Sequence, residues 1–148
     1  MPPGVRYGRG MDACAELATL AGRLAVGETS PRRFLVRLGE EGGGIRRGAL
    51  WMIDATLAGR NRLPGRGFSP ALDDGSTGQA RHFAGTAAAA ARLGAAVTRW
   101  VSVHVRRDPL DSADGRLSEE AIRFAALVRS GDLPLAETEA WIREHLCA

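Results

Sequence analysis

The sequence predicts an all-α protein: a single-domain bundle of about six helices with one long loop rich in glycine, proline and arginine. Apolar residues recur at three- and four-residue steps over most of the chain, as on the buried face of a helix. Serine and proline precede several of these runs in combinations typical of helix starts. The 148 residues, 45% of them hydrophobic and 25% charged, suit one domain with a real core.

The first helix is expected over residues 11–25, where Cys14, Leu17, Ala18, Ala21 and Leu24 share one face. Residues 1–10 have no periodic pattern, so we expect a flexible leader there and the helical domain over residues 11–148. Met11 is an alternative start of the chain.

A second helix is expected to begin at Ser30 and Pro31, because the serine hydroxyl can accept a backbone N–H and proline suits the first helical turn. Gly39 and the glycines at 42–44 are expected to end it, since glycine costs about 1 kcal/mol relative to alanine inside a helix.

Residues 45–58 are apolar around most of the helical circumference, and this helix is expected near the centre with the helix of residues 76–93. Ser76 and Gln79 have capping-box spacing, which predicts the start of the latter helix. The alanines at 87–91 predict a surface where another helix packs closely. The long loop at 59–75 between these helices is interpreted as a lid or binding loop, because loops of this length are uncommon without a role.

Residues 95–107 alternate valines with polar residues, so strand and helix compete there. Helix is favoured because no other segment offers a convincing partner strand, and a lone strand leaves backbone groups unpaired. Ser118 followed by acidic residues predicts the start of the next helix, which Gly131 ends. Pro134 is expected to open the last helix.

All 20 basic residues are arginine, which together with abundant alanine indicates a GC-rich, bacterial coding genome. Although the formal net charge is only +3, residues 32–66 hold eight arginines against three acids. Because arginine contacts phosphates, one hypothesis is nucleic-acid binding through this stretch, and a solvated arginine face is the alternative. The residues proposed for that contact are Arg46, Arg47, Arg60 and Arg62.

Several enzyme classes lack their signatures. There is no lysine, no phosphate-binding loop, no Gly-x-Ser-x-Gly and no Cys-x-x-Cys, which argues against P-loop nucleotide enzymes, ordinary serine hydrolases, lysine Schiff-base enzymes and zinc ribbons. No metal site or cofactor is predicted. His82 and His104 have no assigned third ligand, and Asp108, Asp111 and Asp114 fail the spacing of a calcium loop and fit turns and helix caps.

The only cysteines, Cys14 and Cys147, lie near opposite ends of the chain. A bridge between them is one option, and two free thiols in a reducing cytoplasm are the other. Since no apolar run has the length of a signal peptide or membrane span, we expect a soluble cytoplasmic protein without a membrane partner.

The first candidate site is a helical stripe that carries Gln79, His82 and Thr86 among apolar residues. Buried polar groups need hydrogen-bond partners, and histidine changes charge near neutral pH. As an enzyme, the protein would use His82 as a general base, with Gln79 and Thr86 orienting water or substrate. The alternative is a core histidine with a purely structural hydrogen bond.

Three functions follow from these observations. The leading hypothesis is a helical binding or interaction module that contacts a protein partner or associates with itself, because the apolar faces are better specified than any catalytic machinery. The others are a small hydrolase or toxin-like enzyme centred on His82, and a nucleic-acid-binding protein. A polar cavity with a carboxylate partner around His82 favours the enzyme, and dry packing around it favours the module.

Overall fold

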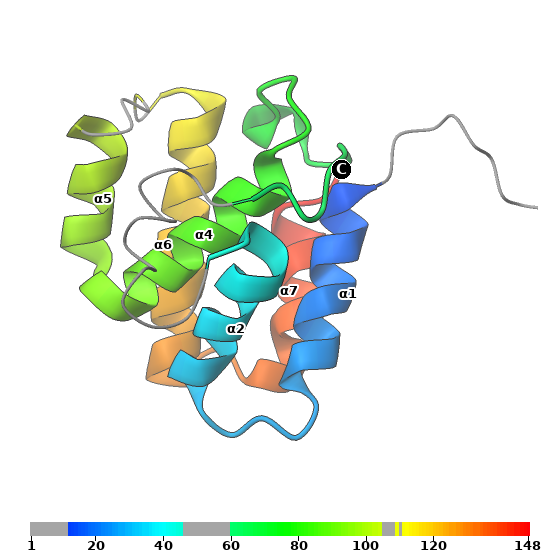
Figure 1. The fold of residues 1–148 in the computed structure, drawn as a ribbon, viewed down its shortest axis with the longest axis vertical. Helices are drawn as coiled ribbons and strands as arrows, with labels where there is room; N and C mark the ends of the chain where they lie inside the picture. Colours follow the sequence, from blue (N-terminus) through cyan, green and yellow to red (C-terminus); the bar gives the residue numbers. More distant parts are fainter. Residues whose placement is uncertain (1–11, 46–59, 105–108, 110) are drawn as a thin grey trace, which may run out of the picture.

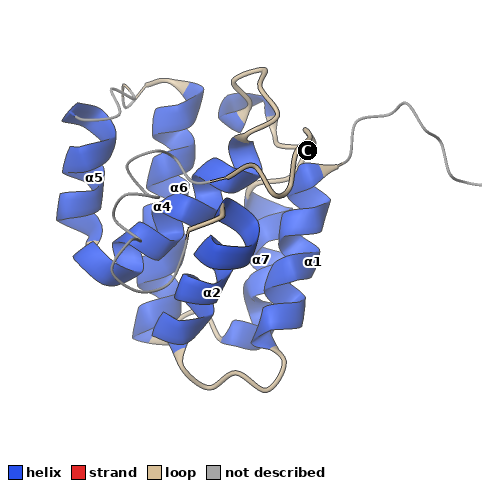
Figure 2. Ribbon diagram, in the orientation of Figure 1, coloured by secondary structure: helices blue, strands red, loops and turns tan. Residues whose placement is uncertain are grey.

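The predicted all-α class is confirmed by a computed structural model, which describes residues 12–45, 60–104, 109 and 111–148. Regular structure in these residues is helical, apart from two isolated β-bridges (Figure 2). The described α-helices are α1 (Ala13–Ala25), α2 (Pro31–Gly43), α4 (Gln79–Leu93), α5 (Ala95–His104), α6 (Ala113–Ser130) and α7 (Thr138–His145), with short 3-10 helices η1 (Pro70–Leu72) and η2 (Leu135–Glu137).

Helix α4 is central, because it packs against α2 on one side and α6 on the other, while α1 lies along α7 (Figure 1). Three fully buried phenylalanines, one from each of the three central helices, join α2, α4 and α6. The ring centroid of Phe124 lies 5.3 Å from that of Phe83 and 6.4 Å from that of Phe34. Burial of each such ring stabilises the fold by about 1.5–3 kcal/mol. The other helix expected at the centre, over residues 45–58, lies outside the described residues from residue 46 onward.

Helix α2 runs through the glycines that were expected to stop it and ends at Gly44, whose φ is +65°. A Cβ on Gly39 would lie 2.3 Å from the Cβ of Ala88, and one on Gly43 would lie 3.0 Å from the backbone N of Gly85. The expected stop at Gly39 was therefore wrong, because close packing of α2 on α4 offsets the helix cost of glycine. The predicted close-packing role of the alanine run is confirmed.

The helix starts divide between confirmed and corrected predictions. Ser30 caps α2 as expected, accepting from the Arg33 N–H at 3.2 Å. Helix α6 begins earlier than expected, with Ser112 accepting from the Gly115 N–H at 3.0 Å, so Ser118 lies inside the helix instead of capping it. The capping box of Ser76 was also wrong, since α4 begins at Gln79 after Gly78.

The remaining elements follow the expected order. Residues 95–104 form the helix α5, so the strand alternative is overturned, and a 3-10 turn precedes α7 in the last helical segment. The predicted leader at residues 1–10 lies outside the described residues. Within the residues that are described, no helix combines the length and apolar character needed to cross a membrane.

A disulfide joins Cys14 on α1 to Cys147 just after α7, with an S–S distance of 2.11 Å. The bridge spans a sequence separation of 133 residues. The same region is held by backbone hydrogen bonds from Ala13 N to Arg66 O and from Ala148 N to Gly67 O, each 2.8 Å. The start of α1 and the residues after α7 are therefore held side by side. Of the two options for the cysteines, the structure has the disulfide.

Candidate catalytic site

The centre of the candidate site is a hydrogen bond between His82 on α4 and Ser118 on α6. His82 Nε2 lies 2.7 Å from Ser118 Oγ. The two residues are only 6% and 3% exposed, respectively. Because water competes little at such a buried position, the hydrogen bond holds the imidazole and the hydroxyl in a defined geometry.

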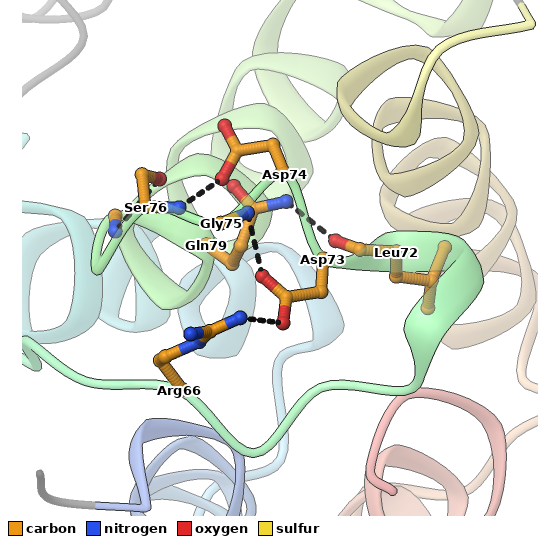
Figure 3. A network of polar contacts seen from close by, with 8 residues as sticks. Arg66, Leu72, Asp73, Asp74, Gly75, Ser76 and Gln79 are labelled. Carbon is orange, nitrogen blue, oxygen red and sulfur yellow. Dashed lines mark hydrogen bonds and ion pairs between the residues drawn. The ribbon is translucent and has the colours of Figure 1, made fainter.

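The turn before α4 carries two aspartates held by backbone N–H groups (Figure 3). Asp73 accepts from the Gly75 N–H and Asp74 from the Ser76 N–H, both at 2.8 Å. This local bonding of an aspartate to the backbone two residues ahead is a common way to shape a turn. Asp73 also forms a 2.8 Å ion pair with Arg66, which fixes the turn against the preceding loop.

Asp74 provides a carboxylate next to the histidine. Partial burial of Asp74 opposes its ionisation, but hydrogen bonds from Ser76, a hydrogen bond with Asp114 and the charge of His82 together lower the pKa of Asp74 below its ordinary value. At neutral pH, Asp74 is therefore a carboxylate within electrostatic reach of His82.

Asp74, His82 and Ser118 supply the three group types that nucleophilic acyl transfer uses. Ser118 Oγ lies at a nucleophile–base distance from His82, and a nearby carboxylate stabilises an imidazolium. Gly78 has no side chain to cap α4, and the positive N-terminal end of the helix lies one turn before His82, at the buried residues Gly78 and Gln79. Such an end favours an oxyanion that develops during reaction.

The structure brings one of the three predicted site residues into this cluster, namely His82. The Gln79 side chain instead donates to the Leu72 carbonyl at 2.5 Å and ties η1 to α4 (Figure 3). Thr86 is buried, and its Oγ1 has no hydrogen-bond partner among the residues that the structure describes. The predicted roles of Gln79 and Thr86 in orienting water or substrate gain no support from these contacts.

Sequence reasoning missed Asp74, Asp114 and Ser118. It treated Asp114 and Ser118 as turn and cap residues because it began the helix too late. Had Ser112 been chosen as the cap, Asp114 and Ser118 would have appeared four residues apart on one helix face. The four-residue spacing of Asp114 and Ser118 was the signal in the sequence that could have identified both residues.

The described part of the long loop is anchored, not hinged. Gly65 N donates to Thr77 O at 3.2 Å, Ser69 N donates to Leu146 O at 2.8 Å, and Arg116 Nε donates to Ala71 O at 2.8 Å. The first bond joins the loop to the turn before α4, and the other two tie it to the end of the chain and to α6. We therefore interpret it as a fixed wall that places Asp74, and the lid interpretation loses support.

None of the arginines proposed for nucleic-acid contact belongs to the cluster of Asp74, His82 and Ser118. Arg60 and Arg62 are exposed in the loop, and Arg46 and Arg47 fall outside the described residues. No group of three or more His, Cys, Asp or Glu side chains in the described part of the chain is placed to hold a metal ion. The chemistry that the geometry offers here is proton transfer and nucleophilic attack.

Comparison with known protein families, with curated proteins and with solved structures found no match to this chain.

Proposed function

We propose that the protein is a small hydrolase in which Ser118 is the nucleophile and His82 its general base. The observation that carries this proposal is the 2.7 Å contact between His82 Nε2 and Ser118 Oγ. Ionised Asp74 supports it, because a carboxylate whose charge interacts with His82 stabilises the imidazolium that forms when His82 takes a proton. The absence of a Gly-x-Ser-x-Gly turn is compatible with this function, since such groups are recognised by geometry and role and recur on unrelated folds.

The proposed reaction begins at the hydrogen bond between His82 and Ser118. Ser118 Oγ attacks the carbonyl carbon of an ester or amide while its proton moves to His82 Nε2. The resulting imidazolium is stabilised by Asp74, and the tetrahedral oxyanion by the N-terminal end of α4. His82 then gives its proton to the leaving group as the bond to carbon breaks. In the second half, His82 takes a proton from water as the water attacks the acyl carbon, and it returns that proton to Ser118 Oγ as the bond between Oγ and the acyl carbon breaks.

Burial of His82 and Ser118 is costly for a protein that only needs a core, whereas Asp74 is exposed. Polar groups removed from water stabilise a fold less than apolar groups of the same volume, even when they are hydrogen-bonded. The binding-module hypothesis retains one observation of its own, the exposure of Val97 (49%) and Trp100 (57%) on α5. The binding-module hypothesis gives no reason for the hydrogen bond of Ser118 to His82 or for the presence of Asp74, so we rank it second.

A fluorophosphonate probe tests the proposal without knowledge of the substrate, because it reacts with serines activated by a base. We expect one probe per chain, mapped to Ser118 by peptide mass spectrometry. The Ser118→Ala variant should lose the label, while Ser130→Ala, which changes an exposed serine at the end of the same helix, should keep it. A folded protein that takes no label, or a label that survives Ser118→Ala, refutes the proposal.

We also propose that the protein works in an oxidising compartment. The Cys14–Cys147 disulfide supports this, because disulfides persist outside the reducing cytoplasm. The cytoplasmic location that the cysteine count suggested stays a prediction, and the bridge argues against it.

A further inference from the structure

A surface cavity of about 390 Å³ lies between the first turns of α2 and the end of α4, away from the candidate catalytic site. Its lining consists of Ser30, Arg32, Arg33, Val36, Arg37 and Arg92. Four of these six residues are arginines, contributed by two helices that pack directly against each other.

The acidic residues nearby neutralise only part of this charge. Glu28 lies 3.1 Å from Arg33. Glu41 lies 3.8 Å from Arg37 and is shared with Arg23, at 3.6 Å. Arg32 forms no ion pair with an acidic side chain that the structure describes. The lining itself holds four arginines and no acidic residue, so the wall of the cavity is positively charged.

Arg32 and Arg92 both line this cavity, and the charge of Arg32 acts on Arg92. Burial, followed by the positive charge of Arg32, lowers the pKa of Arg92. Two like charges held together weaken the fold, and an anion bound between them would relieve the repulsion. The N-terminal end of α2, capped by Ser30, adds its positive dipole to the same place.

We propose that this cavity binds the phosphate group of a small molecule. Guanidinium groups bind phosphate oxygens through paired, charge-assisted hydrogen bonds, and residues on two helices can hold one phosphate from two sides. The volume suits a small ligand, and the lining has no aromatic side chain on which a nucleobase could stack. A sugar phosphate or free phosphate therefore fits better than a nucleic-acid strand. This site is independent of the proposed hydrolase activity.

Isothermal titration calorimetry at low chloride tests the inference with four probes: inorganic phosphate, glucose 6-phosphate, glucose and a short oligodeoxythymidine. We expect the first two to bind the unmodified protein and glucose not to bind. Arg32→Gln and Arg92→Gln should each weaken binding roughly tenfold or more, because each removes a charged hydrogen-bond donor. Arg123→Gln, at an exposed arginine of α6, should leave affinity unchanged. If phosphate alone binds, the source is the free ion, and if glucose 6-phosphate binds more tightly, it is a phosphorylated metabolite.

Three results would overturn the inference: no binding of either phosphate probe, equal affinity in Arg32→Gln and the unmodified protein, or binding of the oligonucleotide alone. Arg32 is exposed, so its variant is expected to fold even if the partly buried Arg92 proves sensitive to substitution. Circular dichroism of each variant checks that the helical content is intact before titration.

Discussion

Reducing the Cys14–Cys147 bridge removes the covalent link between the two ends of the bundle without changing any residue. For a sequence separation of 133 residues, the loop-entropy relation gives a stabilisation of about 5 kcal/mol. Measured bridges typically contribute about 2–4 kcal/mol, and the backbone bonds of Ala13 and Ala148 remain after reduction, so we expect about 4 kcal/mol. At about 2–4 °C per kcal/mol for a chain of this size, the unfolding midpoint should fall by roughly 8–16 °C.

The assay is thermal unfolding followed by circular dichroism, with and without a phosphine reductant, and with mass spectrometry to confirm the state of the thiols. The Cys14→Ala/Cys147→Ala variant is the matched control, and alanine is chosen because Cys14 is fully buried and a serine hydroxyl would lack a partner there. Its midpoint should lie near that of the reduced protein and should not respond to reductant. A reduced protein that melts at the same temperature as the oxidised one would refute the argument that the bridge stabilises this fold.

Three further predictions concern the site, its supporting turn and the helix packing. Ser118→Ala should lower the free energy of unfolding by about 1–3 kcal/mol in urea denaturation, since it leaves the buried His82 without its hydroxyl partner; an unchanged value would show that the bond is weak. Arg66 and the Gly75 N–H lower the pKa of Asp73 below 3.8, so Asp73 stabilises the fold above that pH and loses this effect as pH falls through its folded-state pKa. The midpoint of Asp73→Asn should therefore lie below that of the unmodified protein near neutral pH and approach it toward about pH 2, and a constant difference would contradict the ion pair. Gly39→Ala should destabilise by about 1–3 kcal/mol through its clash with Ala88. Gly85→Ala should be neutral or stabilising, because among the residues that the structure describes its new Cβ meets only Ile45, at 3.7 Å; equal effects would dispute the close packing of α2 on α4.

Local signals in the sequence were sufficient for most helices and insufficient for the site. The cap at Ser30 and the apolar face of α1 depend on neighbours within one or two turns, so they could be predicted. Gly39 was misjudged because its helix cost is local, while the approach of Ala88 that offsets it is a tertiary contact.

The same distinction explains the site. His82 could be identified from the sequence, because the spacing within one helix places this titratable side chain among apolar residues. Its partner Ser118 lies 36 residues away, and only the packing of α4 against α6 brings the two together. Asp74 was missed because its orientation depends on the turn bonded to Ser76, which sequence reasoning had assigned to a helix cap.

The rate at which a fluorophosphonate labels Ser118, compared between the unmodified protein and His82→Gln, tests the hydrolase proposal most directly. A general base contributes about 100-fold or more, so we predict at least that loss in the variant, and a labelling rate in the unmodified protein that rises with pH through one ionisation and then levels off. Equal labelling rates in both proteins, with folding confirmed, would contradict the assignment of His82 as the base that activates Ser118.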